Sequence, residues 1–148
     1  MNATVSTEAV TVPAWFRVVA VLALLWELFG VAMYLMHVGV LPNDPSQMSE
    51  AERSLMESSP MWVTGLFAIG VFSGALGAVG LVLPRRWARP VLVLSLIAVV
   101  LQFGGWLLLT DAIAIIGPTV FVMPLIIVLV AILLVWLADM GAKRGWLR

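Results

Sequence analysis

Four long apolar runs, separated by short segments that hold proline or charge, constrain this chain more than any other feature. They cover residues 14–38, 61–83, 88–109 and 118–138. A helix needs about 20 residues to cross a hydrocarbon core of about 30 Å, so each run is long enough to span a membrane. Barrel strands would alternate in polarity over about ten residues, and these runs do not. The sequence therefore predicts an all-α membrane protein with four transmembrane helices.

The composition agrees with a membrane location. Of the 148 residues, 63% are hydrophobic and 11% are charged, whereas a globular domain carries about 25% charged residues. With no cysteine and one histidine, the chain lacks a disulfide framework, a thiolate nucleophile and zinc-ligand spacing. We expect no metal and no cofactor. No basic stripe is interleaved with aromatic residues, which excludes a nucleic-acid surface.

The links between the runs predict a topology. They are short, so neighbouring helices should be antiparallel, in an up-down bundle that forms one domain over residues 1–148. The outer loop, residues 41–60, contains one basic residue, Arg53. The other seven of the eight basic residues lie on the opposite side, and the positive-inside rule makes that side cytoplasmic: Arg17, Arg85, Arg86, Arg89, Lys143, Arg144 and Arg148. Both termini should be cytoplasmic, with residues 1–12 as a polar tail.

The outer loop contains a helix-start signal. Ser49 is followed three residues later by Glu52, which is the spacing of a capping box. A short helix over residues 50–58 should follow, and its Leu55 and Met56 make it amphipathic. It could lie along the membrane surface, form a solvated loop with a helical turn or two, or act as a lid over an outward-facing cavity.

Glu27 lies near the middle of the first apolar run. An ionisable side chain at that depth costs a few kcal/mol or more, so it usually faces protein or a water-filled cavity. Steps of three or four residues from Glu27 reach Ala20, Ala23, Gly30 and Tyr34, which form a mostly small stripe. Because small residues allow membrane helices to approach closely, we expect Glu27 to face another helix.

The other runs also predict packing faces. The second run places Gly70, Ser73, Gly74 and Gly77 on one arc. The third run places Ser95, Ala98, Gln102 and Gly105 on another. We expect five glycines to serve helix packing: Gly30, Gly70, Gly74, Gly77 and Gly105. The fourth run has no polar side chain from Val120 to Ala138, so it should be the most lipid-exposed helix.

Depth brings three polar residues together. At 1.5 Å per residue, Glu27 lies about 21 Å from Pro13, Gln102 about 18 Å from Pro90, and Ser73 about 16 Å from Pro84. We predict a buried polar cluster in which Gln102 donates a hydrogen bond to Glu27, with Ser73 or Tyr34 as further partners.

Three roles are possible for the predicted cluster. It could be a polar staple that fixes helix register, a proton- or cation-linked transport site, or a contact with another subunit or pigment. An enzyme is not expected, because Ser73 and Ser95 have no histidine at their depth to act as a base. The leading hypothesis is a small-solute transporter with its polar site at Glu27. Four helices leave little room for a solute path within a single copy of the chain. A homo-oligomer is therefore expected, the simplest being a homodimer. The alternative is a non-catalytic accessory or assembly subunit of a larger membrane complex, packing through Gly70 and Gly77.

Three stretches carry a family resemblance: WVTGLFAIGVFSGALG at residues 62–77, RWARPV at 86–91 and RGWLR at 144–148. With the apolar runs from about Ala14 onward, they resemble a family of small four-span bacterial inner-membrane proteins, many of which carry an automatic sugar-transporter label. The resemblance implies the four-span topology and a bacterial inner membrane. In that family we would expect Asn as often as Glu at position 27.

Overall fold

The computed structural model describes residues 10–148, and within that range it contains six α-helices and no strand. Four helices are long and apolar enough to cross a membrane, the last together with the 3₁₀ turn Pro118–Phe121 that precedes it. Residues 1–9 of the predicted tail lie outside the described residues. The helices are α1 (Ala14–His37), α2 (Glu50–Ser58), α3 (Met61–Val82), α4 (Ala88–Leu109), α5 (Ala112–Ile116) and α6 (Val122–Lys143).

Proline residues set where the long helices begin. Pro13 and Pro60 are the N-cap residues of α1 and α3, both with extended backbone. Pro90 and Pro124 lie in the first turns of α4 and α6. The first N–H groups of a helix have no intrahelical partner, so proline loses nothing at these positions.

Left-handed glycines end α1 and α6. Gly39 has φ 76° and Gly145 has φ 72°, and the residue after each donates back into the helix, Val40 to Leu35 O (2.9 Å) and Trp146 to Gly141 O (2.9 Å). This is the Schellman arrangement, which satisfies the last carbonyls of a helix. The predicted ends at residues 38 and 83 are each one residue too long, because α1 ends at His37 and α3 at Val82.

The last helix runs further than the predicted 118–138. It continues to Lys143 and passes through Asp139. Asp139 forms ion pairs with Arg89 of α4 (3.0 Å) and with Lys143 one turn on (2.6 Å). The helical i+4 spacing of Asp139 and Lys143 predicts their pair, which is confirmed, whereas the pair with Arg89 was not predicted.

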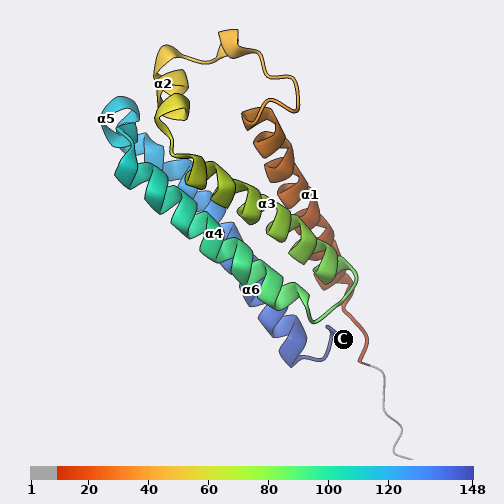
Figure 1. Ribbon diagram of the computed structural model, residues 1–148. Helices are drawn as coiled ribbons and strands as arrows, with labels where there is room; N and C mark the ends of the chain where they lie inside the picture. The colour runs from red at the N-terminus through yellow and green to blue at the C-terminus, as the bar shows by residue number, and fades with distance from the viewer. Residues whose placement is uncertain (1–9) are drawn as a thin grey trace, which may run out of the picture.

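The four long helices lie side by side, with α2 and α5 together at one end and the C-terminus at the other (Figure 1). Helix α3 contacts both α1 and α4, and α6 packs mainly on α4. Val10 lies near Gly145, so both ends of the described chain share one end of the bundle. We call this the termini end, and the end with α2 and α5 the loop end.

Exposure along the helices differs from the prediction. Among the 18 most apolar consecutive residues of each span, the share of residues that are buried is 11% in α1, 22% in the Pro118–Lys143 span and 44% in α3. Helix α1 is therefore the most exposed span, and the prediction for the fourth span was wrong. The fourth helix buries Ala131, Leu134, Leu137 and Ala138, which shows that close packing here does not require a polar side chain.

The five predicted packing glycines lie where helices or rings come close. A Cβ on Gly70 would lie 3.0 Å from Val99 Cγ2, and one on Gly77 would lie 2.5 Å from Leu92 Cγ. On Gly105 it would overlap the Trp62 ring, and on Gly30 it would touch Val71 at 3.4 Å. The Gly70 and Gly77 face is therefore filled by α4 of the same chain.

A buried cluster closes the termini end. Its members come from α1, α3, α4, α6 and the C-terminal segment: Phe16, Ala20, Ala23, Leu81, Ala88, Leu92, Leu134, Leu137, Ala138, Trp146 and Leu147. The C-terminal segment is tied to the α3–α4 loop, because Arg148 N–H donates to Pro84 O (2.9 Å) and Arg86 N–H donates to Arg148 O (3.0 Å). The Arg86 guanidinium also donates to Leu147 O (3.2 Å).

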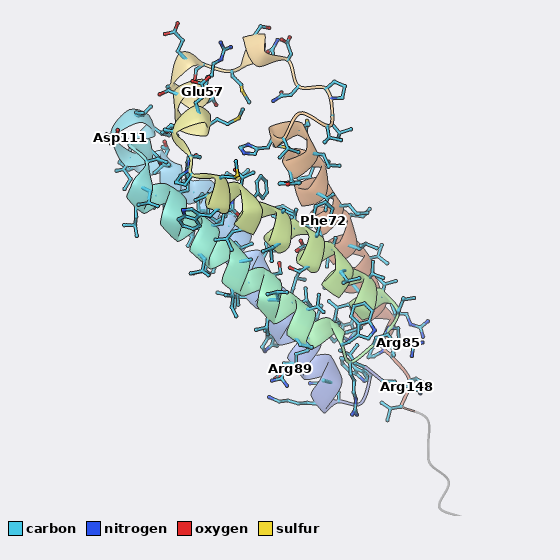
Figure 2. All side chains as sticks on the ribbon, in the orientation of Figure 1. Glu57, Phe72, Arg85, Arg89, Asp111 and Arg148 are labelled. Atoms are coloured by element: carbon cyan, nitrogen blue, oxygen red, sulfur yellow. The ribbon has the colours of Figure 1, made fainter. Side chains whose placement is uncertain are left out.

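Charge is divided between the two ends. Figure 2 places Arg85, Arg89 and Arg148 at the termini end and Glu57 and Asp111 at the loop end. This is the asymmetry on which the topology prediction rests.

Candidate functional site

A cavity of about 220 Å³ lies among α1, α3, α4 and α6. Glu27 is the one ionisable residue in its lining. Two further polar side chains, Ser95 and Gln102, line it from α4. The rest of the lining is glycine, alanine and larger apolar groups: Trp26, Phe29, Gly30, Met33, Phe67, Gly70, Val71, Val99, Phe103, Met123, Ile127 and Ala131. The cavity is thus an apolar chamber with one carboxylate in its wall.

The Glu27 carboxylate rests against a glycine of the neighbouring helix. A Cβ built on Gly74 of α3 would overlap the carboxylate, with the carboxyl carbon 2.8 Å away. The same Cβ would lie 3.0 Å from Ser95 Oγ of α4. Gly74 therefore makes the room in which side chains from α1 and α4 approach each other across α3.

Ser95 is the buried polar residue of this site, with 5% of its surface exposed. Its hydroxyl donates to the carbonyl oxygen of Gly70 at 2.7 Å, a bond that joins α4 to α3. The hydroxyl proton is thereby used, while the oxygen keeps the capacity to accept a hydrogen bond. Ser95 thus offers an acceptor beside the carboxylate.

Gln102 and Glu27 line the same cavity, but the predicted hydrogen bond between them is not formed. Within residues 10–148, no side chain or backbone N–H donates to the Glu27 carboxylate. The two residues therefore face a shared space, and the carboxylate has no cationic partner in the described chain.

Ser73 and Tyr34, the other predicted members of the cluster, do not line the cavity. The Ser73 hydroxyl donates to carbonyl oxygens of its own helix, those of Ile69 and Gly70. Tyr34 packs its ring edge-on against Phe67 and Phe72, with centroids 5.3 and 5.7 Å apart. Depth selected Ser73 and the helical stripe of Glu27 selected Tyr34, but neither side chain enters the cavity.

Ser95 takes the place that was predicted for Ser73. Its signal was in the sequence, because Ser95 shares one helical arc with Ala98 and Gln102. A serine on the face of a second polar residue at i+7 is the better candidate for a shared cavity.

A second cavity, of about 350 Å³, lies at the loop end. It shares Phe67, Gln102 and Phe103 with the first, so the two cavities adjoin. Its lining has two ionisable residues, His37 and Glu52. The remaining members are Leu55, Met56, Ser59, Val63, Thr64, Trp106 and Ile116.

Helix α2 forms one wall of this outer chamber. Ser49 caps it, since its hydroxyl accepts from Glu52 N–H at 3.2 Å and the Glu52 carboxylate accepts from Ser49 N–H at 2.8 Å. Those hydrogen bonds from the backbone and hydroxyl of Ser49 hold the pKa of Glu52 below its usual value. Leu55 anchors the helix, because it is buried against Ala112 and Val120.

The chain offers little to other kinds of site. Among residues 10–148, no three His, Asp or Glu side chains gather where they could hold a metal ion. The α5 helix in the third link was not predicted, and it serves as the surface on which Leu55 rests.

Comparison with known proteins adds no assignment to this geometry. No protein family model, no curated protein and no solved structure matches the chain.

Proposed function

We propose that this protein is a carrier for small solutes in a bacterial inner membrane, with its solute site at Glu27. The observation that carries the proposal is the pair of adjoining cavities between the loop end and Glu27. On the other side, the buried cluster around Phe16 and Leu137 blocks the way to the termini end. A site that is reached from one end and sealed at the other is what one state of an alternating-access carrier requires.

The orientation follows from the charges. Seven of the eight basic residues lie at the termini end, which the positive-inside rule assigns to the cytoplasm. The cavities then open toward the outer face, and α2 lies in the outer loop as an amphipathic segment. In this orientation the structure corresponds to an outward-facing state.

A second copy of the chain is part of the proposal. Only 11% of the most apolar window of α1 is buried, and α1 leaves large side chains such as Leu22, Leu25 and Phe29 exposed. In a homodimer this face could contribute the other half of a path that four helices are too few to enclose.

The test uses the absence of cysteine from the chain, which makes single cysteines specific reporters. Gln102→Cys lies where the two cavities meet. A membrane-impermeant thiol reagent should label it from the outer face, and also from the cytoplasmic face when the carrier alternates. Ala98→Cys, one turn away on α4 and 2% exposed, should resist the reagent from both faces.

Two outcomes would count against the carrier. If Gln102→Cys resists labelling from both faces, the cavities are closed to water and a polar staple is the better description of Glu27. If it is labelled from one face under every condition, the site does not alternate. Arg85→Cys, exposed at the termini end, reports the orientation in the same vesicles.

The alternative, an accessory subunit of a larger complex, loses the surface that was predicted for it. The Gly70 and Gly77 face is covered by α4, so a partner would have to bind another exposed apolar face, such as that of α1 or α6. Native mass spectrometry of mildly solubilised protein separates the two proposals, since a homodimer favours the carrier and a stoichiometric foreign partner favours the accessory subunit.

A further inference from the structure

We propose that the ligand of the Glu27 cavity is a compact, mostly apolar molecule with a single positive charge, whose cation pairs with the Glu27 carboxylate. This inference rests on the proposed function, because it names the class of solute for the same site.

The charge argument comes from the linings of both cavities. The inner one contains Glu27 as its one ionisable residue, and the outer one contains Glu52 and His37. Neither lining includes Lys or Arg. A cation that enters from the loop end therefore passes one carboxylate and reaches another, whereas an anion meets only groups that repel it or leave it unpaired. A partly buried carboxylate without a cationic partner is costly, so a cationic ligand would supply the charge partner that the described chain does not.

The shape of the chamber selects the rest of the molecule. Apolar side chains make up most of its wall, and four of them are aromatic: Trp26, Phe29, Phe67 and Phe103. Aromatic rings attract cations through their faces, by about 2 kcal/mol or more when water is excluded. The same rings also accommodate apolar groups. Sugars and other polyhydroxylated solutes would need many hydrogen-bond partners, and this wall offers three polar side chains.

Size and depth narrow the class further. A cavity of about 150 Å³ holds a benzene molecule, so 220 Å³ has room for one ring and a short cationic arm. Glu27 lies ten residues before His37 on α1, or about 15 Å below the loop end of that helix. A lipid headgroup would not reach that depth, which favours a free molecule over an amine-bearing lipid.

The test compares three probes of nearly the same shape: benzyltrimethylammonium, its neutral isostere neopentylbenzene, and the anion phenylmethanesulfonate. Binding is measured by titration calorimetry on the purified full-length protein in nanodiscs, with protein-free nanodiscs as the reference for partition into lipid. The cation should bind at least about tenfold more tightly than the neutral isostere, as expected for a charge pair of about 1.5 kcal/mol. The anion should bind least.

The Glu27→Gln variant supplies the decisive comparison. It keeps the shape of the side chain and removes the charge, so it should reduce the preference for the cation about tenfold, leaving only the part that comes from the aromatic rings, while the neutral probe binds as before. Retained neutral binding shows that the variant is folded. Glu57→Gln on α2, whose side chain lines neither cavity, should keep the full preference.

The outcomes separate this inference from the proposed function. Equal binding of cation and neutral probe in the unchanged protein, or a cation preference that Glu27→Gln leaves undiminished, overturns the inference and leaves a cavity that a carrier could still use. If no probe binds and Gln102→Cys also resists labelling, both proposals are wrong. If the cation preference is present in nanodiscs without phosphatidylethanolamine and is lost in nanodiscs rich in it, the lipid amine competes for Glu27 and the free-solute inference is wrong.

Discussion

The two halves of this bundle are built from the same four helices but packed in opposite ways. At the termini end, Phe16 and Leu137 are almost fully buried among residues of α1, α3, α4 and α6. Toward the loop end lie two adjoining cavities, of which the inner one is lined by α1, α3, α4 and α6 and has a carboxylate and aromatic rings in its wall. The first half holds the helices together, and the second leaves space that a ligand can fill.

Side-chain size on α1 accounts for much of this difference. Ala20 and Ala23 are buried, so α1 can approach its neighbours closely at the termini end. Further along, the larger side chains of Trp26, Phe29 and Met33 line the inner cavity. A membrane helix gains little by burying apolar groups away from lipid, so contact with small residues decides where α1 is fixed.

Removal of the same side chain from each half of α1 should give the largest difference in stability. Phe16→Ala should lower the free energy of unfolding by about 3 kcal/mol, because it leaves a hole in a closed cluster. Phe29→Ala should change it by less than about 0.5 kcal/mol, because that ring is 59% exposed. Unfolding in mixed micelles with rising SDS fraction measures both. Similar losses for the two variants would show that the halves are equally packed.

Two glycines, Gly77 toward the termini end and Gly104 toward the loop end, should change the free energy of unfolding in opposite directions when replaced by alanine. Gly77→Ala should destabilise by about 2 kcal/mol through overpacking, since the new Cβ would lie 2.5 Å from Leu92 Cγ. Gly104→Ala should stabilise by up to about 1 kcal/mol through helix propensity, because no heavy atom would lie within 4 Å of its Cβ. The same unfolding assay measures both variants. If Gly104→Ala destabilises the protein, the new Cβ meets a neighbour and the space around Gly104 is not open.

The smallest effect concerns α2 and pH. The hydrogen bonds from Ser49 lower the pKa of Glu52, so they stabilise α2 above the unfolded pKa of about 4.3. That contribution is lost as pH falls through the lower folded-state value. Backbone NMR shifts of residues 50–58 should move toward coil below about pH 4 while those of α3 stay constant. Ser49→Ala should remove this pH response, and a response that survives the substitution would place its origin elsewhere.

The spans were predictable because length and apolarity are local properties. The third span was predicted with its exact bounds, Ala88–Leu109, and each of the four long helices has a proline at or near its start. The i+4 pair of Asp139 with Lys143 was predictable for the same reason. The ion pair of Asp139 with Arg89 was missed because it joins two helices, and such a contact is not local.

The site was predictable in height but not in direction. Depth along each helix placed Glu27 and Gln102 at one level, and both line the inner cavity. Depth also selected Ser73, whose hydroxyl turns back to its own helix, while Ser95 was left out of the predicted site. The rotation of each helix about its axis depends on which small residues meet, as Gly70 meets Val99, and that is settled only when the helices pack.

Gly74 links two positions that have no chemistry in common. The carboxylate at position 27 occupies the volume that any side chain at position 74 would need. The combined size of the two side chains is therefore limited. A residue one methylene shorter at position 27 would free that volume for alanine at position 74. The pair is therefore expected to vary together among related chains, with glycine required wherever the longer acid is kept.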